Sequence, residues 1–246
     1  MENTITIATS RLVAQSRAME VTADNIANAA TPGFKSARMQ FSDWIARQGA
    51  TTAPRGGATL AYTQDRATWR DFQAGPLSHT ANPLDLGITG EGFFTVATPQ
   101  GPMLTRAGRF SLSSDGTVTN AAGQALLDTA GQPIRLSPTD TTLTIAGDGT
   151  ISSENGRVSK VGVVAPADPM RLQAQGSAGY RSGSATAPVA APAIVQGAIE
   201  DSNVQPMQEM VRMMSDLREF QFATQMVEGE DQRQQSAIDK ILQRRG

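Results

Sequence analysis

The chain has 246 residues, enough for one large domain or for a smaller domain with extensions. Its formal net charge of -2 gives no electrostatic basis for binding nucleic acid, and the absence of cysteine excludes disulfides, thiolate metal sites and cysteine nucleophiles. No apolar run approaches the roughly 20 residues that a membrane-spanning helix needs, and the first residues lack the pattern of a secretory signal, so neither membrane insertion nor a cleaved signal peptide is expected.

The first predicted element is a helix from about residue 3 to about residue 45. Ile5, Leu12, Met19 and Ile26 recur every seven residues, which gives a narrow apolar seam rather than a broad stripe. Such a seam is typical of a helix that packs on other helices, and a helix of this kind is only marginally stable alone. The pattern therefore predicts a helix that needs partners.

Residues that end helices follow this seam. Asn25 and Asn28 are poor in a helix interior because their side chains compete for backbone hydrogen bonds, but near a helix end they can bond the following turn. Pro32 pushes the residue before it out of the helical region, and Gly33 permits a positive φ angle, so the chain can turn sharply. Phe34 is then placed to dock against another surface.

The middle of the chain, from about residue 60 to about residue 195, has the pattern of short strands. Apolar runs alternate with turn residues, and Asp115-Gly116 and Asp148-Gly149 each give a hairpin signal. The sequences that begin at these turns, DGTVTNAAGQ and DGTISSENGR, are similar and predict two similar hairpins. Two stretches rich in small residues, 47–59 and 176–193, are expected to be loops or mobile segments.

A second long helix is predicted from about Pro206 to Arg244, with Ser202 or Asn203 as its N-cap. Its first apolar residues have the spacing of a coiled-coil seam, and a second apolar group closes the run. The first group is Met207, Met210, Met214 and Leu217, and the second is Ile238, Ile241 and Leu242.

Together these elements predict an α+β fold, in which long N- and C-terminal helices form a coiled-coil pair around a central, mainly-β domain. The expected division is an N-terminal helical segment for assembly (1–45), a linker (46–77), the β domain (78–195) and a C-terminal helical segment for assembly (196–246). Two paired helices cannot bury seams on all their sides, so the arrangement calls for further copies or other partners.

Residues that carry chemistry are sparse. His79 is the only histidine and lies in a predicted turn, where a solvated loop residue is the better explanation. The glycine-rich run at 87–94 lacks the features of a phosphate or dinucleotide loop and is expected to be a tight turn before a strand. We expect no catalytic residue, no cofactor and no metal, although the sequence alone does not exclude Glu91 and Asp85 as an enzymatic carboxyl pair.

Three ordered blocks of the sequence resemble the axial proteins of the bacterial flagellum, the rod and hook family. The block at 21–36, VTADNIANAATPGFKS, is similar to the family pattern of Ala-Asn-Asn-(Leu/Ile)-Ala-Asn followed by Thr-x-Gly-(Phe/Tyr)-Lys, with Asp24 in place of the first Asn. Residues 82–118 resemble the start of the family's β domain, and residues 197–221 resemble its C-terminal block. The resemblance spans nearly the whole chain.

The resemblance implies a structural subunit of the flagellar basal-body rod, without catalysis, that polymerises into a helical tube which transmits torque and conducts exported subunits. Within the family, length and the middle domain leave a proximal or a distal rod subunit, and residues 1–28 and 218–242 resemble the proximal one more. A distal rod subunit is the alternative, and a soluble binding module or a cell-wall-acting enzyme are further alternatives. The implied partners are copies of the chain, neighbouring rod subunits and the flagellar type III export apparatus, with no nucleic acid and no membrane insertion. The implied location is the periplasmic rod, reached without a cleaved signal peptide.

In this interpretation the terminal helices form the inner wall of the tube, and Phe34 docks against neighbouring helices. The residues expected at assembly interfaces are Ile5, Leu12, Met19, Asn25, Ile26, Asn28, Pro32, Gly33, Phe34, Met207, Met210, Met214, Leu217, Ile238, Ile241 and Leu242.

Overall fold

The computed structural model describes residues 2–47, 59–137, 140 and 142–243, and within these it does not describe the side chains of 2–7, 41–47, 59–67 and five positions between 234 and 242. The chain forms two compact units. The helical unit comprises residues 1–26, 37–69 and 205–246, and the β unit comprises residues 27–36 and 70–204. Two helices and a mainly-β region confirm the predicted α+β class.

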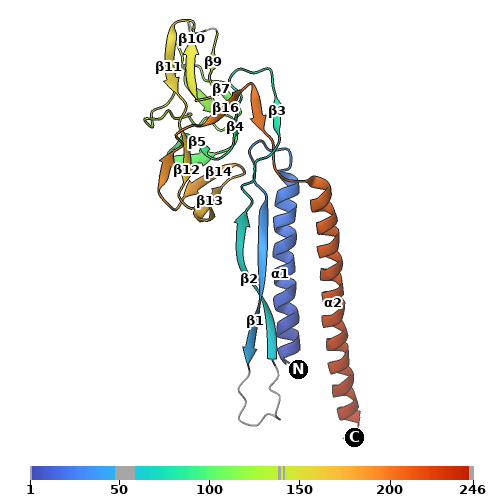
Figure 1. Cartoon of the computed structure of the whole chain (residues 1–246). Coiled ribbons are helices and arrows are strands. Elements are labelled where there is room, and N and C mark those ends of the chain that lie inside the picture. The colour runs from blue at the N-terminus through green and yellow to red at the C-terminus, as the bar shows by residue number, and fades with distance from the viewer. Residues whose placement is uncertain (1, 48–58, 138–139, 141, 244–246) are drawn as a thin grey trace. The chain divides into compact units, whose positions relative to one another are not determined.

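The helical unit contains two long helices and a two-stranded sheet (Figure 1). Helix α1 has 26 residues and helix α2 has 38, and α1 lies between the sheet and α2. Gln15 contacts Glu219 and Asn25 contacts Glu209, so the two helices run antiparallel. The elements are α1 (Glu2–Ala27), β1 (Ala37–Arg47), β2 (Thr59–Arg70) and α2 (Pro206–Gln243).

The N-terminal helix is shorter than the sequence predicts. It ends at Ala27, and residues 37–45, expected to be helical, belong to strand β1. After the turn at Pro32-Gly33, Met39 and Phe41 alternate with polar residues, which is the two-residue period of a strand. Strand β2 lies within the predicted linker, of which residues 48–58 fall outside the described part. The division into assembly and linker segments stays a prediction.

The β unit is built from short antiparallel strands. Its largest sheet has six strands in the order β13-β14-β6-β5-β12-β15, and smaller sheets pair β16 with β4, β17 with β3, β7 with β8, and β10 with both β9 and β11. The strands are β3 (Leu77–His79), β4 (Leu86–Thr89), β5 (Phe93–Thr98), β6 (Gly101–Thr105), β7 (Phe110–Leu112), β8 (Val118–Asn120), β9 (Thr144–Ile145), β10 (Thr150–Ser153), β11 (Gly156–Lys160), β12 (Val163–Pro166), β13 (Leu172–Gln175), β14 (Gly179–Ser182), β15 (Thr186–Pro188), β16 (Ala193–Gln196) and β17 (Ala198–Glu200), with a short 3-10 helix, η1, at Pro169–Arg171.

The two predicted Asp-Gly hairpins are present and share one local geometry. The carboxylate of Asp115 accepts the backbone N–H and the hydroxyl of Thr117, and Asp148 binds Thr150 in the same way. Because both oxygens of Asp148 accept hydrogen bonds, chiefly from the N–H and hydroxyl of Thr150, the pKa of this carboxyl falls to about 2.

A further repeat in the β unit was not predicted. The backbone N–H of Leu126 donates to Val118, that of Ile134 donates to Leu126, and that of Val118 donates to Ile134. These three residues, eight apart in the sequence, form a closed ring of backbone hydrogen bonds, and their side chains join the main core. The ring thus joins three segments of the chain at the main core.

The stretch at 176–193 is structured, contrary to the prediction of a loop or mobile segment. It contains β14 and β15, and Tyr180 on β14 is almost fully buried in a second core with Phe93 and Leu104. The ring of Phe72 meets those of Phe93 and Tyr180 edge to face. Tyr180, the pairing of β14 with β6 and of β15 with β12, and the packing of Val189 on the main core hold this segment in place.

Candidate assembly site

The turn after α1 forms as its residues dictate. The backbone N–H of Phe34 donates to the carbonyl of Thr31 at 3.2 Å, with Pro32 and Gly33 between them and Gly33 at a φ of 70°. This is the pattern of a type II turn, in which proline fixes the first central residue and glycine supplies the positive φ of the second. The side chain of Asn28 accepts a hydrogen bond from the Thr31 hydroxyl at 3.2 Å, so it bonds the following turn as expected.

Gly33 and Phe34 pack within their own chain. The Gly33 N–H donates to the carbonyl of Glu200 at 2.7 Å, and a Cβ atom at Gly33 would lie 2.2 Å from the backbone nitrogen of Ala107. Phe34 is fully buried, with the guanidinium of Arg70 over its ring. The expectation that Phe34 docks against neighbouring helices is therefore corrected: its ring has no exposed surface to offer a neighbour.

A buried ion triad follows Phe34 in the β unit. The ammonium of Lys35 lies 2.5 Å from one carboxylate oxygen of Glu200, and the guanidinium of Arg106 lies 2.9 Å from the other. All three side chains are buried. Lys35 also donates to the carbonyl of Gln73, and Arg106 donates to the carbonyls of Ile88 and Gly90. Burial lowers the pKa of Lys35, and the bond to Glu200 opposes that fall.

Asn203 closes the same region of the β unit. Its side-chain oxygen accepts the backbone N–H of Ser36, and its amide donates to the carbonyls of Asp71 and Gln73. The side chain of Asn203, predicted to cap α2, is thus bonded to other segments. The hydroxyl of Ser202, the other predicted cap, accepts the N–H of Val204, which precedes the helix. The predicted N-cap is therefore wrong, and Asn203 instead joins three segments that are distant in the sequence.

A second polar cluster lies in the helical unit, around Asn25 on α1. The Asn25 amide both donates to the carbonyl of Ala37 and accepts its N–H, at 2.9 and 2.8 Å, so it holds the first residue of β1. It also donates to Glu209 of α2 at 3.3 Å. Glu209 is 1% exposed and lies 2.7 Å from Arg38 and 3.2 Å from Arg212. Asn25, predicted from its place at a helix end, is thus the centre of a buried network.

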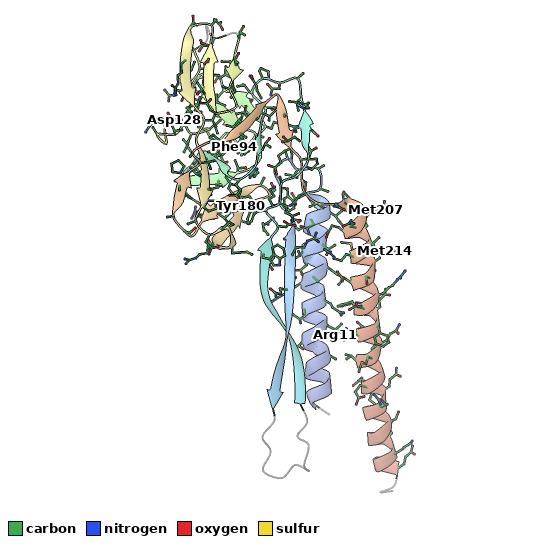
Figure 2. The ribbon with its side chains drawn as sticks, in the orientation of Figure 1. Arg11, Phe94, Asp128, Tyr180, Met207 and Met214 are labelled. Atoms are coloured by element: carbon green, nitrogen blue, oxygen red, sulfur yellow. The ribbon has the colours of Figure 1, made fainter. Side chains whose placement is uncertain are left out.

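Helix α2 exposes a row of apolar side chains along one side. We call it the methionine face, and its side chains are between 46% and 73% exposed. Met207 and Met214, labelled in Figure 2, belong to it. Isolated exposed apolar residues are ordinary, but a stripe along one helix marks an interaction surface. The methionine face consists of Met207, Met210, Val211, Met214, Leu217, Phe222 and Met226.

The other predicted interface residues have mixed surroundings. Leu12, Met19 and Ile26 on α1 are partly buried in the chain, as are Asn28 and Pro32. Ile5, Ile238, Ile241 and Leu242 lie on the two helices, but their side chains fall outside the described part. Whether these residues serve assembly stays a prediction.

Seven residues of these clusters were not among the predicted site residues: Lys35, Arg38, Arg106, Glu200, Asn203, Glu209 and Arg212. Most of them lie inside the blocks that carry the family resemblance, and Glu200 ends an apolar strand, which is an unusual place for a carboxylate. That signal points to a buried partner, but it does not say which cation is the partner.

Asp216 gives a pH-dependent prediction for the helical unit. It lines a cleft of about 370 Å³ among α1, β1, β2 and α2, and burial, followed by the charges of Glu219 and Glu209, raises its pKa. The folded state then binds the Asp216 proton more tightly than the unfolded state does. At a pH above this raised pKa the carboxylate is ionised in both states, and its charge lowers the free energy of unfolding. We expect Asp216→Asn to raise the melting temperature at pH 7, and the gain to vanish below about pH 3.9, where the unfolded carboxyl is also protonated. Melting curves of both proteins across pH test this, and a gain independent of pH would contradict it.

The residues considered for chemistry have different surroundings. His79 is exposed at the end of β3, and Glu91 is exposed in the turn before β5. Asp85 is buried and accepts hydrogen bonds from Thr80 and Asn82. Over the described ranges, no group of three or more histidines and carboxylates is placed to hold a metal ion, and neither helix is long and apolar enough to cross a bilayer.

Comparison with known families matches the same three blocks. Residues 5–35 match the family described as flagella basal body rod protein, residues 87–153 match the flagellar hook protein FlgE/F/G D1 domain, and residues 195–240 match the flagellar basal body rod FlgEFG protein C-terminal family. The first match ends at Lys35, and the third contains Glu200, Asn203 and Glu209. The matched segments thus contain most of both polar clusters.

Relatives align over nearly the whole chain. The flagellar basal-body rod protein FlgF of Caulobacter vibrioides is 32% identical over 98% of both chains, and that of Mesorhizobium japonicum is 30% identical over 90% of both. The flagellar basal-body rod protein FlgG of Bacillus subtilis is 30% identical over 90% of this chain and 92% of its own. With three family segments in order and full-length similarity, the chain belongs to the family of flagellar basal-body rod proteins.

Proposed function

We propose that this chain is a structural subunit of the proximal flagellar rod, which polymerises through its terminal helices into a tube that transmits torque and conducts exported subunits. The observation that carries the proposal is the methionine face, an apolar stripe on a long helix that the chain itself leaves uncovered. The full-length FlgF relatives favour the proximal position. The FlgG relative keeps a distal rod subunit as the alternative.

The proposal includes coiled-coil pairing of helices in the assembled tube. Within the chain, the described polar contacts of α1 with α2 join Gln15 and Arg11 to Glu219, and Asn25 to Glu209. Within the methionine face, Met207, Met210, Met214 and Leu217 have the heptad spacing that suits a second partner helix. Its partners in the proposal are copies of this chain and neighbouring rod subunits, and its location is the basal-body rod, with delivery by the flagellar export apparatus and no cleaved signal peptide. Family membership is the support for these points.

A clean deletion of the gene tests the proposed position. Electron microscopy of purified basal bodies is expected to show rods arrested short, without the distal segment and hook. Rods that reach the distal segment but lack its end would favour the distal alternative. Complete rods and hooks would contradict any role as a rod subunit.

The methionine face gives a more specific prediction. Met214→Glu places a charge on an exposed surface of the free chain, so its stability should change by less than about 0.5 kcal/mol. In an assembled interface the same carboxylate would be buried without a partner, so each contact should weaken by roughly 3 kcal/mol, about a hundredfold. Melting of the free chain and complementation of the deletion strain measure the two effects.

Met214→Leu is the matched control, because it changes the same exposed side chain and keeps it apolar. It is expected to support rod formation. Normal rods with Met214→Glu would contradict the use of the methionine face in assembly.

A further inference from the structure

Helix α2 presents two faces of different chemistry. The methionine face is exposed, and a second row of residues at alternating spacings of three and four is buried or partly buried. At about 100° per residue the centres of the two rows lie roughly 180° apart around the helix. We call the second row the inner face, and it consists of Glu209, Met213, Asp216, Phe220, Ala223, Val227 and Glu230.

This orientation is the reverse of what burial of apolar surface alone would favour. A methionine or leucine side chain gains about 1.5 to 3 kcal/mol when it leaves water, so a rotation of half a turn that placed the methionine face on α1 would bury more apolar surface. The inner face instead carries three carboxylates toward the rest of the unit. Some feature of the unit must therefore oppose that rotation.

The opposing feature is the surface that α1 and β1 present to α2. Gln15, Thr22 and Asn25 of α1 are buried polar residues, and Arg38 of β1 reaches the same side. An amide or guanidinium left unpaired against methionine would cost about 1 to 3 kcal/mol, and more for the charged group. The polar surface of α1 and β1 thus matches a polar face of α2.

The buried carboxylate of Glu209 makes two of the polar bonds that join α2 to this surface. Its oxygens accept from Asn25 of α1 at 3.3 Å and from Arg38 of β1 at 2.7 Å, and Arg212 on α2 closes the cluster at 3.2 Å. Ten residues further along α2, Glu219 accepts from Gln15 at 3.0 Å, but its side chain is 56% exposed. The bonds of the buried Glu209 therefore hold α2 in this rotation about its axis. Buried polar groups that fix register or orientation between helices are a known use of such pairs.

We propose that Glu209 is a positioning residue that sets the rotation of α2 about its axis and so directs the methionine face outward, toward a helix of a second copy of this chain. The stripe extends from Met207 to Met226, about 28 Å along the helix, which suits a partner helix of at least that length. Over the described residues, α1, with 26 residues, and α2, with 38, are the helices long enough to cover it. The use of the outward face rests on the proposed function, but the rotation set by Glu209 does not.

Because the chain has no cysteine, single reporters can measure the rotation directly. Met214→Cys reports the methionine face and Ala223→Cys reports the inner face, where Ala223 is 8% exposed. With each reporter in the full chain at a concentration where sedimentation shows a monomer, a maleimide should label position 214 at least about tenfold faster than position 223. Adding Glu209→Leu should bring the two rates to within about twofold, while circular dichroism stays helical.

Glu230→Leu is the matched control, because it removes a carboxylate from the same inner face three heptads away, outside the Asn25 cluster. It should leave the tenfold ratio unchanged. If Glu209→Leu does not fold, Glu209→Gln, which keeps the shape and removes the charge, should lower the ratio at least about threefold. An unchanged ratio in a folded Glu209 variant would overturn the proposal.

The same reporter separates this proposal from the proposed function. Raising the protein concentration, or adding unlabelled chain, should slow labelling at position 214 if the methionine face associates. If association does not slow maleimide labelling at position 214, the result would count against assembly through this face. The ratio of the labelling rates at positions 214 and 223 in the monomer would still show whether Glu209 sets the rotation.

Discussion

Replacing Gly33 by alanine is expected to destabilise the β unit by about 3 to 5 kcal/mol. Two costs combine at this position. Gly33 has a φ of 70°, which a residue with a Cβ adopts at a cost of about 1 kcal/mol or more. The new Cβ would also lie 2.2 Å from the nitrogen of Ala107 and 2.3 Å from the carbonyl carbon of Arg106, and backbone atoms cannot move aside as a flexible side chain can.

Gly123→Ala is the control that isolates the first of these costs. Gly123 has a φ of 75°, but an added Cβ would meet no atom within 4 Å. Its substitution should cost about 1 kcal/mol. Urea unfolding of the full chain, with hydrogen exchange of peptides from β4 and β6 to place the effect in the β unit, compares the two variants. Equal losses for Gly33→Ala and Gly123→Ala would mean that the close backbone approach at Gly33 does not limit substitution.

The sequence predicts well those features that depend on neighbouring residues. The end of α1 near Asn28, the turn at Gly33, the Asp-Gly hairpins and the long helix α2 all follow from local pattern, and all are present. The strand at residues 37–47 was missed because the heptad pattern was extended past a turn that had already ended it. The segment around Tyr180 was missed because its burial depends on Phe72 and Phe93, far away in the sequence.

The site was predicted only in part, for a related reason. Asn25, Gly33 and Phe34 could be predicted because they lie at a helix end and a turn, which are local features. The residues that contact this region lie up to about 180 positions away, and no sequence periodicity predicts a polar contact of that separation. On α2, two rows of residues both have heptad spacing, and the more apolar row was chosen as the seam. The polar surface formed by Asn25 and Arg38 decides which row faces inward, and that surface exists only in the folded chain.

Glu200→Gln should have an effect as large as that of Gly33→Ala, by an electrostatic route. The substitution keeps the size of the side chain but leaves Lys35 and Arg106 as two buried cations that face a neutral amide. Removing one partner of a buried ion pair costs about 3 to 5 kcal/mol, because the remaining charge stays desolvated. Asp201→Asn is the matched control, since Asp201 is the next residue, is partly exposed and accepts a hydrogen bond from Ser78. It should cost less than about 1.5 kcal/mol.

The pH dependence of the Glu200→Gln loss identifies its cause. Burial already lowers the pKa of Lys35, and the bond to Glu200 opposes that fall, so the variant should lower this pKa further. The pKa of Lys35 in the folded variant then lies below the value of about 10.4 in the unfolded chain. Between these two pH values the unfolded chain binds more protons than the folded chain, so the free energy of unfolding increases as the pH rises. The difference in free energy of unfolding between variant and parent, measured by urea unfolding, should therefore be smaller at alkaline pH than at pH 7.

Adding Lys35→Met to the variant should recover part of the loss at pH 7, because it removes one of the two uncompensated charges. A loss that is the same at both pH values, and that Lys35→Met only deepens, would show that Glu200 acts through packing rather than through its charge.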